Sequence, residues 1–251
     1  MYLSILHVSI NYVMGNEEPK RVFTFTQLAA ATQNFIQQLC IGEGGTSKVY
    51  KGHLQETGQI VAVKRLDKTI FHRVAKEFEV EVQLLGQLRH QNVVFLIGHC
   101  IEGEEILLVY EFMELGSLAD QLHDPSLNKA VLSWRTRVEV ALGVAKGLAY
   151  LHDPSHRDHH HHHPVIHRDL KSSNILLDAN FVPKISDFGI SKFEPVGENT
   201  HVSTQVKATF GFLAPEYVLS GHLTTRADVY SFGVVLWELS PLGANSRKES
   251  N

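Results

Sequence analysis

The first hundred or so residues alternate between hydrophobic and polar positions in a pattern that predicts a small sheet carrying one helix. Residues 41–51 and 59–66 are rich in β-branched side chains around glycines, and the polar residues 55–58 between them are typical of a hairpin turn. Residues 74–88 repeat apolar side chains at helical spacing, which predicts an amphipathic helix. The apolar run at 106–112 indicates a buried strand.

After residue 116 the pattern becomes mainly helical. Residues 118–122 and 134–151 show helical spacing, and the second segment has a broad apolar face. Residues 165–166, 175–177 and 184–185 are short β-like pieces. They place the polar residues beside them at the edges of loops, where functional residues usually lie.

The N-terminal segment predicts a short helix and no membrane span. Residues 23–32 indicate an extended entry into a helix, with Thr26 as its N-cap. Residues 1–13 are fairly apolar, but they lack a positively charged region and are too short to cross a bilayer. No transmembrane segment is therefore expected.

Composition, net charge and cysteine count limit the classes of protein to which the chain can belong. The 251 residues are 43% hydrophobic and 20% charged, which suits one or two folded domains with a sizeable core. The net charge is −4 and no run of five or six like charges occurs, so nucleic acid is not an expected partner. The two cysteines, Cys40 and Cys100, are too few for a disulfide framework or a zinc site and favour a reducing compartment.

Two features of the first half suit the binding of nucleotide phosphates. Residues 42–49 form a glycine-rich turn, and glycine lacks the Cβ that would keep a phosphate from backbone N–H groups, although such a turn can equally be a plain hairpin. Lys64 follows an apolar run, 61–63, where a buried lysine needs an acidic partner. Glu81 on the predicted helix is the candidate, and its alternative is an ordinary solvated glutamate.

The second half carries groups that phosphoryl transfer requires. The reaction needs a carboxylate beside the attacking hydroxyl and oxygen ligands for magnesium, which Asp169, Asn174 and Asp187 can supply. Asp169 taken alone could be a plain turn aspartate. Its position in His-Arg-Asp-Leu-Lys-Ser-Ser-Asn (167–174), followed by Asp-Phe-Gly (187–189) and Ala-Pro-Glu (214–216), argues against that alternative.

On these motifs the chain resembles the eukaryotic protein-kinase superfamily over about 41–239. The segments most similar to plant receptor-like cytoplasmic serine/threonine kinases are 23–25, 31–32, 34–35, 108–113 and 200–204. The resemblance implies an α+β, bilobal protein-kinase-like fold, with a small N-lobe antiparallel sheet with one helix and a mainly helical C-lobe that is incomplete. The expected boundaries are an N-terminal tail, 1–22; a lead-in with the N-lobe and hinge, 23–113; a partial C-lobe, 114–242; and a C-terminal tail, 243–251.

The same resemblance implies a role for each matching residue. Asp169 is expected to accept the proton of the substrate hydroxyl, Lys171 to steady the transferred phosphate, and Asn174 with Asp187 to hold Mg²⁺. Thr209 resembles the loop threonine of serine/threonine kinases. The residues expected to bind ATP, with Tyr110 as gatekeeper and the backbone of Glu111 and Met113 as hinge, are Ile41, Gly42, Glu43, Gly44, Gly45, Val49, Ala62, Lys64, Glu81, Tyr110, Glu111 and Met113.

Partners, modification and location also follow from the resemblance. The expected cofactors are ATP and Mg²⁺, and the expected partners are a protein substrate with a serine or threonine hydroxyl and an upstream receptor kinase. Ser203 and Thr204 are expected phosphorylation sites, because Arg168 can pair with a phosphate. The expected location is cytoplasmic, including the periphery of the plasma membrane.

The chain departs from the family pattern at several positions. Ser47 replaces the third glycine of the turn, Thr46 replaces the phenylalanine at its tip, and Ala208 replaces the glycine before Thr209. The first two changes predict a looser hold on phosphates, and the third restricts the backbone. The histidine run 159–163 is expected to be a loop spacer rather than a metal site.

The place where the sequence ends leaves alternative functions to consider. The sequence stops soon after the predicted helix 225–239, and the family arginine that would pair with Glu216 lies beyond residue 251. The leading interpretation is an active kinase. The alternatives are a catalytically impaired kinase fold that acts as a scaffold or decoy, and an incomplete product without a stable fold.

Overall fold

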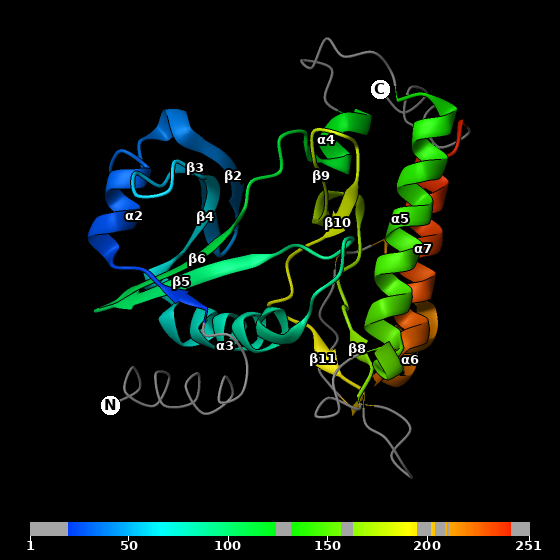
Figure 1. The fold of residues 1–251 in the computed structure, drawn as a ribbon. Helices are drawn as coiled ribbons and strands as arrows, with labels where there is room; N and C mark the ends of the chain where they lie inside the picture. Colours follow the sequence, from blue (N-terminus) through cyan, green and yellow to red (C-terminus); the bar gives the residue numbers. More distant parts are fainter. Residues whose placement is uncertain are drawn as a thin grey trace, which may run out of the picture. The chain divides into compact units, whose positions relative to one another are not determined.

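The computed structural model describes residues 20–123, 132–156, 163–194, 202–203, 209 and 211–241, which divide into two compact units (Figure 1). Unit 1 takes its described residues from the chain up to Arg89 and from Val94–Phe112. Unit 2 takes them from His90–Val93 and from Met113 onward. Within the described residues, no helix combines the length and the apolarity needed to cross a bilayer.

Unit 1 is built on a six-stranded sheet with the order β1-β5-β6-β4-β3-β2. Its strands are β1 (Arg21–Val22), β2 (Cys40–Gly44), β3 (Ser47–His53), β4 (Ile60–Leu66), β5 (Leu96–Glu102) and β6 (Glu105–Glu111). The pairs are antiparallel except β1 with β5. The predicted hairpin is confirmed, and Gly58 ends its turn with a φ of 69°.

Two helices cover opposite faces of this sheet. They are α2 (Phe25–Ala31) and α3 (Phe71–Gln87). Val63 of β4 packs against α2, and its neighbour Lys64 contacts Glu81 of α3. Successive side chains of a strand point to opposite faces, so one strand serves both layers. The sequence predicted α3 as residues 74–88, close to the observed bounds.

The start of α2 corrects one prediction. The N-cap is Thr24, not Thr26: its hydroxyl accepts from Gln27 N at 3.1 Å, and the Gln27 side chain accepts from Thr24 N at 2.9 Å. This reciprocal pair is a capping box, which satisfies two N–H groups at the helix start. Thr26 lies inside the first turn of α2, where its hydroxyl cannot cap.

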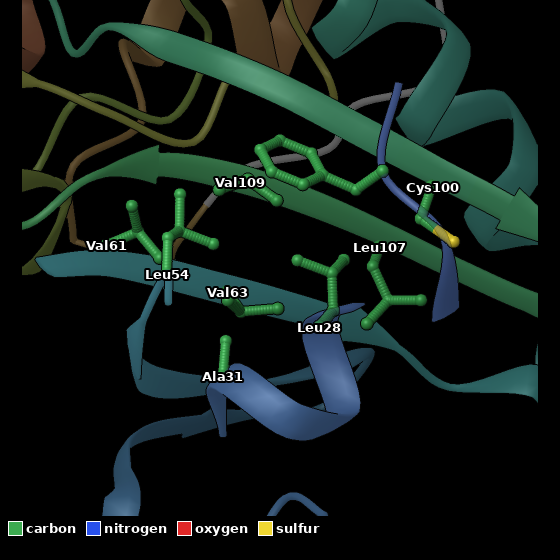
Figure 2. Packing of buried hydrophobic residues seen from close by; sticks show 9 residues of the cluster. Leu28, Ala31, Leu54, Val61, Val63, Cys100, Leu107 and Val109 are labelled. Carbon is green, nitrogen blue, oxygen red and sulfur yellow. The ribbon is translucent and has the colours of Figure 1, made fainter. Parts of the chain in front are cut away.

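The core between α2 and the sheet is aliphatic. Leu28 and Ala31 project from α2 toward Val63 and Leu107 of the sheet (Figure 2). Burial raises the pKa of the Cys100 thiol in this core to about 12, so the thiol stays protonated. The cluster comprises Phe23, Leu28, Ala31, Leu54, Val61, Val63, Cys100, Leu107 and Val109.

The sequence did not predict β1 or β5. Phe23 N donates to His99 O at 2.8 Å, which continues the β1–β5 pairing by one residue. The two strands come so close at Gly98 that a Cβ there would lie 2.0 Å from Arg21 O. Glycine is therefore required at this position for β1 to join the sheet.

Unit 2 is mainly helical. Its helices are α4 (Leu118–His123), α5 (Trp134–His152), α6 (Pro215–Ser220) and α7 (Thr225–Leu239), and α5 packs along α7 (Figure 1). The predicted bounds of α4, α5 and α7 agree with these to within one residue. Short strands join its loops in a three-stranded sheet of order β10-β9-β7 and in the two pairs β11-β8 and β12-β13. They are β7 (Gly116–Ser117), β8 (Val165–Ile166), β9 (Ile175–Leu177), β10 (Pro183–Ile185), β11 (Lys192–Phe193), β12 (Val202–Ser203) and β13 (His222–Leu223).

Two glycines let α5 approach the loops that carry polar residues. A Cβ at Gly143 would lie 2.4 Å from Pro183 Cγ, and one at Gly147 would lie 2.7 Å from Asn92 O. Asn92 in turn donates from Nδ2 to Pro183 O at 2.8 Å and accepts from Ile185 N at 2.9 Å. The strand β10 that precedes Asp187 is thereby fixed against α5.

Candidate functional site

Residues predicted to bind the nucleotide in unit 1 share one face of the sheet. Val49 of β3 is the cross-strand partner of Lys64 on β4, and Tyr110 of β6 is the partner of Ala62. Directly opposed residues point to the same face, and Ala62 and Lys64 are two positions apart on one strand. These four side chains therefore lie on the face that α3 covers, opposite α2.

The glycine-rich turn joins β2 to β3. Gly42 is opposite Val49, and Glu43 pairs with Lys48 across the hairpin, with 3.0 Å between Oε1 and Nζ. Asp67 N donates to Thr46 O at 2.9 Å, so the tip of the turn is tied to the end of β4. A Cβ at Gly45 would meet no described atom within 4 Å. Packing within unit 1 therefore does not require glycine at the tip.

Lys64 and Glu81 form the predicted ion pair. Lys64 Nζ donates to Glu81 Oε2 at 2.9 Å, and the Glu81 side chain is only 2% exposed, so the solvated alternative is wrong. Tyr110 OH donates to the other carboxylate oxygen, Oε1, at 2.6 Å. The Lys64 ammonium and the Tyr110 hydroxyl thus bind the same buried carboxylate. The bond from Tyr110 fixes the Glu81 side chain, which in turn holds Lys64.

In unit 2 the predicted catalytic residues converge on the Asp169 carboxylate. Lys171 Nζ lies 2.8 Å from Asp169 Oδ2, and Asn174 Nδ2 donates to the same oxygen at 3.1 Å. Thr209, 40 residues further along, donates to Asp169 Oδ1 from its hydroxyl at 2.7 Å and from its backbone N at 3.1 Å. Lys171 Nζ also donates to Thr209 Oγ1 at 2.7 Å. Three neighbouring residues of one loop and a threonine 40 residues away from Asp169 therefore form one polar cluster.

The loop that carries Asp187 is tied to the same cluster. Ser186 donates to Asn174 O from its backbone N at 2.9 Å and from its hydroxyl at 3.0 Å. Asp187 itself is exposed and has a φ of 66°, in the left-handed region that few side chains adopt. Strained backbone of this kind collects at functional sites. Phe188 is fully buried, which anchors the loop on its other side.

Asp228 is a site residue whose role the sequence did not reveal. Its fully buried carboxylate accepts from His167 N at 2.7 Å, from Arg168 N at 2.8 Å and pairs with His152 Nε2 at 2.9 Å. These bonds hold Arg168 at a φ of 74°, a left-handed conformation immediately before Asp169. The sequence does hold one indication: Asp228 stands on an apolar helix, and burying an acid there costs free energy unless the acid has partners.

A protein-family model described as protein tyrosine and serine/threonine kinase matches residues 35–251. The chain belongs to this family. Serine/threonine-protein kinase PBL27 of Arabidopsis thaliana is 55% identical over 219 residues, which are 87% of this chain and 41% of that relative. Serine/threonine-protein kinase PBS1 of the same plant is 54% identical over 217 residues, which are 86% of this chain and 46% of the relative.

A third relative, probable serine/threonine-protein kinase PBL25 of Arabidopsis thaliana, is 53% identical over 225 residues, which are 90% of this chain and 57% of that protein. The chain thus spans about half the length of the curated relatives it matches. These similarities agree with the predicted resemblance to plant receptor-like cytoplasmic serine/threonine kinases, and the α+β kinase fold predicted from the sequence is confirmed.

Arg168, expected to pair with a phosphate, has other partners in unit 2. Its guanidinium donates to Ile190 O and to Tyr217 OH, both at 2.9 Å. Of the two predicted phosphorylation sites, Ser203 lies on β12 opposite His222, and Thr204 lies outside the described residues. Phosphorylation at both positions stays a prediction.

Other predictions fall partly outside the described residues. His163, the last of the histidine run, contacts Glu194 O at 3.2 Å through Nδ1, and 159–162 are not described. Among the residues that the structure describes, no group of three or more His, Cys, Asp or Glu side chains is placed to hold a metal. Glu216, expected to be one half of a buried ion pair, is exposed in the first turn of α6.

Proposed function

We propose that this chain is an ATP-dependent kinase that transfers the γ-phosphoryl group to serine or threonine hydroxyls of proteins. The observation that supports it most strongly is the Asp169 cluster, in which a carboxylate, the Lys171 ammonium and the Thr209 hydroxyl lie within hydrogen-bond distance of one another. A carboxylate that accepts a hydroxyl proton beside a cation that balances phosphate charge is what this reaction requires.

The residues of unit 1 fit a nucleotide. Neither packing nor backbone conformation demands glycine at Gly45, so the approach of a phosphate to backbone N–H groups is a sufficient reason for it. Lys64 presents a cation on the same sheet face as Val49, Ala62 and Tyr110. Within unit 1 we assign the phosphates to Lys64 and the turn 42–45, and the adenine to Ala62, Tyr110 and the backbone of Glu111, with Ile41 beside the turn. Met113 belongs to unit 2, and its role in binding adenine stays a prediction.

The residues of unit 2 fit Mg²⁺. Asn174 uses its Nδ2 to donate to Asp169, so its amide oxygen is the atom suited to a metal, and Asp187 offers a carboxylate on an exposed, strained loop. Carboxylate and amide oxygens are the ligands that a hard cation prefers. When bound, Mg²⁺-ATP would supply the phosphoryl group and neutralise its developing charge.

The remaining steps belong to the side chains of this chain. Asp169 would orient the substrate hydroxyl and accept its proton at a carboxylate oxygen. Lys171 would place its ammonium beside the transferred group, as its contact with Asp169 Oδ2 allows. Thr209 would position Asp169 through its two donated bonds.

Substrate class and location rest on the relatives. The three Arabidopsis relatives are named as serine/threonine-protein kinases, which supports serine and threonine rather than tyrosine as acceptors here. We propose further that an upstream receptor kinase is a partner, and that the protein acts in the cytoplasm and at the periphery of the plasma membrane. No described observation favours the scaffold or decoy alternative.

Phosphate transfer from radiolabelled Mg²⁺-ATP to casein tests the proposal. Asp169→Asn should lower kcat by about 10²- to 10⁴-fold, the usual contribution of a positioned acid–base group. Glu139→Gln on the exposed surface of α5 is the matched control and should retain parental activity. An unchanged rate in Asp169→Asn would contradict the proposal. A parent chain that binds Mg²⁺-ATP and transfers nothing would favour the decoy alternative.

A further inference from the structure

The lead-in segment, residues 20–36, contacts β4, which carries Lys64, and is linked through Phe95 and His99 to α3, which carries Glu81. At its first residue, Lys20 Nζ lies 4.2 Å from the centroid of the Phe95 ring. The same ring faces the Arg89 guanidinium at 5.0 Å. Arg89 donates to Leu85 O and Leu88 O, at 3.0 and 2.8 Å, and so caps the C-terminal end of α3. One aromatic ring therefore joins the lead-in segment to the helix of Glu81.

A second path reaches α3 through β5. Phe23 N donates to His99 O, and the His99 ring packs edge-on against Phe78 of α3 with 5.8 Å between centroids. Phe78 lies three residues before Glu81, on the same face of the helix. The lead-in segment is thus linked to α3 through Phe95 at the end of the helix and through His99 near Glu81.

The other end of the segment reaches β4 beside Lys64. The Arg65 guanidinium lies 4.5 Å from the centroid of Phe35 and 5.7 Å from that of Phe25. Arg65 also donates to both oxygens of Glu105 on β6, at 2.8 and 2.7 Å. A planar guanidinium that is stacked on one side and held bidentately on the other leaves its strand little freedom.

Backbone strain marks the same end. Gln33, Asn34 and Phe35 have φ values of 51°, 56° and 57°, three consecutive non-glycine residues in the left-handed region. Phe35 N donates to Thr32 Oγ1 at 3.2 Å, and the Phe35 ring stacks on Phe25 at 5.7 Å. Such a run persists only where surrounding contacts hold it, and here it brings Phe35 against Arg65.

We infer that the lead-in segment positions the Lys64–Glu81 pair. Its positioning residues are Phe35 of the segment itself and Phe95, whose ring receives Lys20 of the segment. Phe95 holds α3 through Arg89, and Phe35 holds β4 through Arg65. The inference rests on the proposed function for its effect on catalysis. Burial does not explain an aromatic residue at position 95, because Phe95 is 40% exposed. Two cations that contact one ring do explain it.

Conservative and non-conservative variants of the full chain separate positioning from packing. Phe95→Leu keeps an apolar side chain and removes the aromatic face, while Phe95→Tyr keeps that face. Phe35→Leu and Phe35→Tyr form the corresponding pair at β4. Val22→Thr is the control, since Val22 lies on β1 with a side chain that is 68% exposed.

Amide hydrogen exchange without nucleotide should show the effect directly. Phe95→Leu should speed exchange in the last turns of α3, and Phe35→Leu should speed exchange in β4, each by about three- to tenfold, as expected for the loss of cation–π contacts. Both tyrosine variants and Val22→Thr should stay within about twofold of the parent, because all three keep an aromatic face beside each cation. In casein phosphorylation, kcat should fall for the leucine variants while the KM for casein stays unchanged.

Equal exchange in Phe95→Leu and the parent would overturn the inference, and so would equal loss in Phe95→Leu and Phe95→Tyr. If Phe95→Leu does not melt cooperatively, Lys20→Met and Lys20→Arg replace it. Lys20→Met should speed exchange in α3 as predicted for Phe95→Leu, and Lys20→Arg should exchange like the parent. Equal exchange in the two Lys20 variants would contradict the inference. A parent without phosphate transfer would refute the proposed function alone, since the exchange measurement still decides whether the segment positions α3 and β4.

Discussion

The charged groups of unit 1 and those of unit 2 are held in place by different means. Lys64 and Glu81 stand on a strand and a helix, and each is the ionic partner of the other. Asp169 stands on a loop, and its carboxylate is surrounded by donors from three other residues. Regular elements fix a side chain through packing behind it, whereas a loop needs a separate anchor. In unit 2 that anchor is Asp228.

The buried carboxylates of Glu81 and Asp228 show the same contrast. Glu81 is neutralised by a lysine and accepts a hydrogen bond from a tyrosine hydroxyl, and mutation can remove either side chain. Asp228 accepts two backbone N–H groups that no substitution elsewhere removes, together with His152. Loss of Asp228 therefore leaves buried donors without an acceptor, while loss of Lys64 leaves a single charge that a second substitution can neutralise.

The largest effect is expected for Asp228→Ala. It should lower the free energy of unfolding by about 3 to 5 kcal/mol, because two buried N–H groups lose their acceptor and the left-handed Arg168 loses its support. Urea denaturation measures the loss, and phosphate transfer should disappear with it. Glu216→Ala, an exposed acid at the start of α6, should cost less than about 1 kcal/mol. Similar losses for the two variants would show that Asp228 is no anchor.

Lys64→Met should come next. Removing the cation leaves Glu81 buried and uncompensated, and the free energy of unfolding should fall by about 3 kcal/mol. Lys64→Met/Glu81→Gln should regain most of that stability, since glutamine is neutral and can still accept from Tyr110, yet phosphate transfer should remain lost. Glu139→Gln, which breaks an exposed pair with Arg135 on α5, is the control. Failure of the double variant to regain stability would contradict the pairing.

A smaller, pH-dependent effect is expected at Glu105. Its bidentate bonds from Arg65 hold the pKa of the Glu105 carboxyl below its usual value. A lowered pKa adds stability above the unfolded value, about 4.3, and this stability is lost as the pH falls through the folded pKa. Glu105→Gln should therefore cost about 1 kcal/mol at pH 7 and less at pH 3. A loss that is equal at both pH values would contradict this origin.

The smallest effect tests the corrected helix start. Thr24→Ala removes the capping box of α2 and should lower the free energy of unfolding by about 1 kcal/mol. Thr26→Ala, one residue into the helix, should change it by less than about 0.5 kcal/mol because its hydroxyl caps nothing. Thermal melts of the two variants provide the comparison, and a greater loss in Thr26→Ala would restore the prediction made from the sequence.

Local patterns predicted those parts of the structure whose cause is local. The helix 225–239 and the hairpin around 55–58 follow from spacing and turn residues, and the need of Lys64 for an acid follows from its apolar strand. The strands β1 and β5 were not predicted, because their pairing depends on the close approach of Gly98 to Arg21 O, which only the folded sheet shows. The partners of Asp228 were not predicted, because they lie 60 or more residues away from it in the sequence.

Thermal unfolding with and without Mg²⁺-ATP tests most directly whether the Lys64 face of unit 1 binds the nucleotide while Asp169 of unit 2 serves the transfer step. A ligand that binds only the folded state raises the melting temperature. Mg²⁺-ATP should raise it for the parent and for Asp169→Asn, which keeps the nucleotide-binding residues and loses transfer. It should raise it far less for Lys64→Met/Glu81→Gln. No shift in the parent, or an equal shift in all three proteins, would contradict nucleotide binding by the Lys64 face of unit 1.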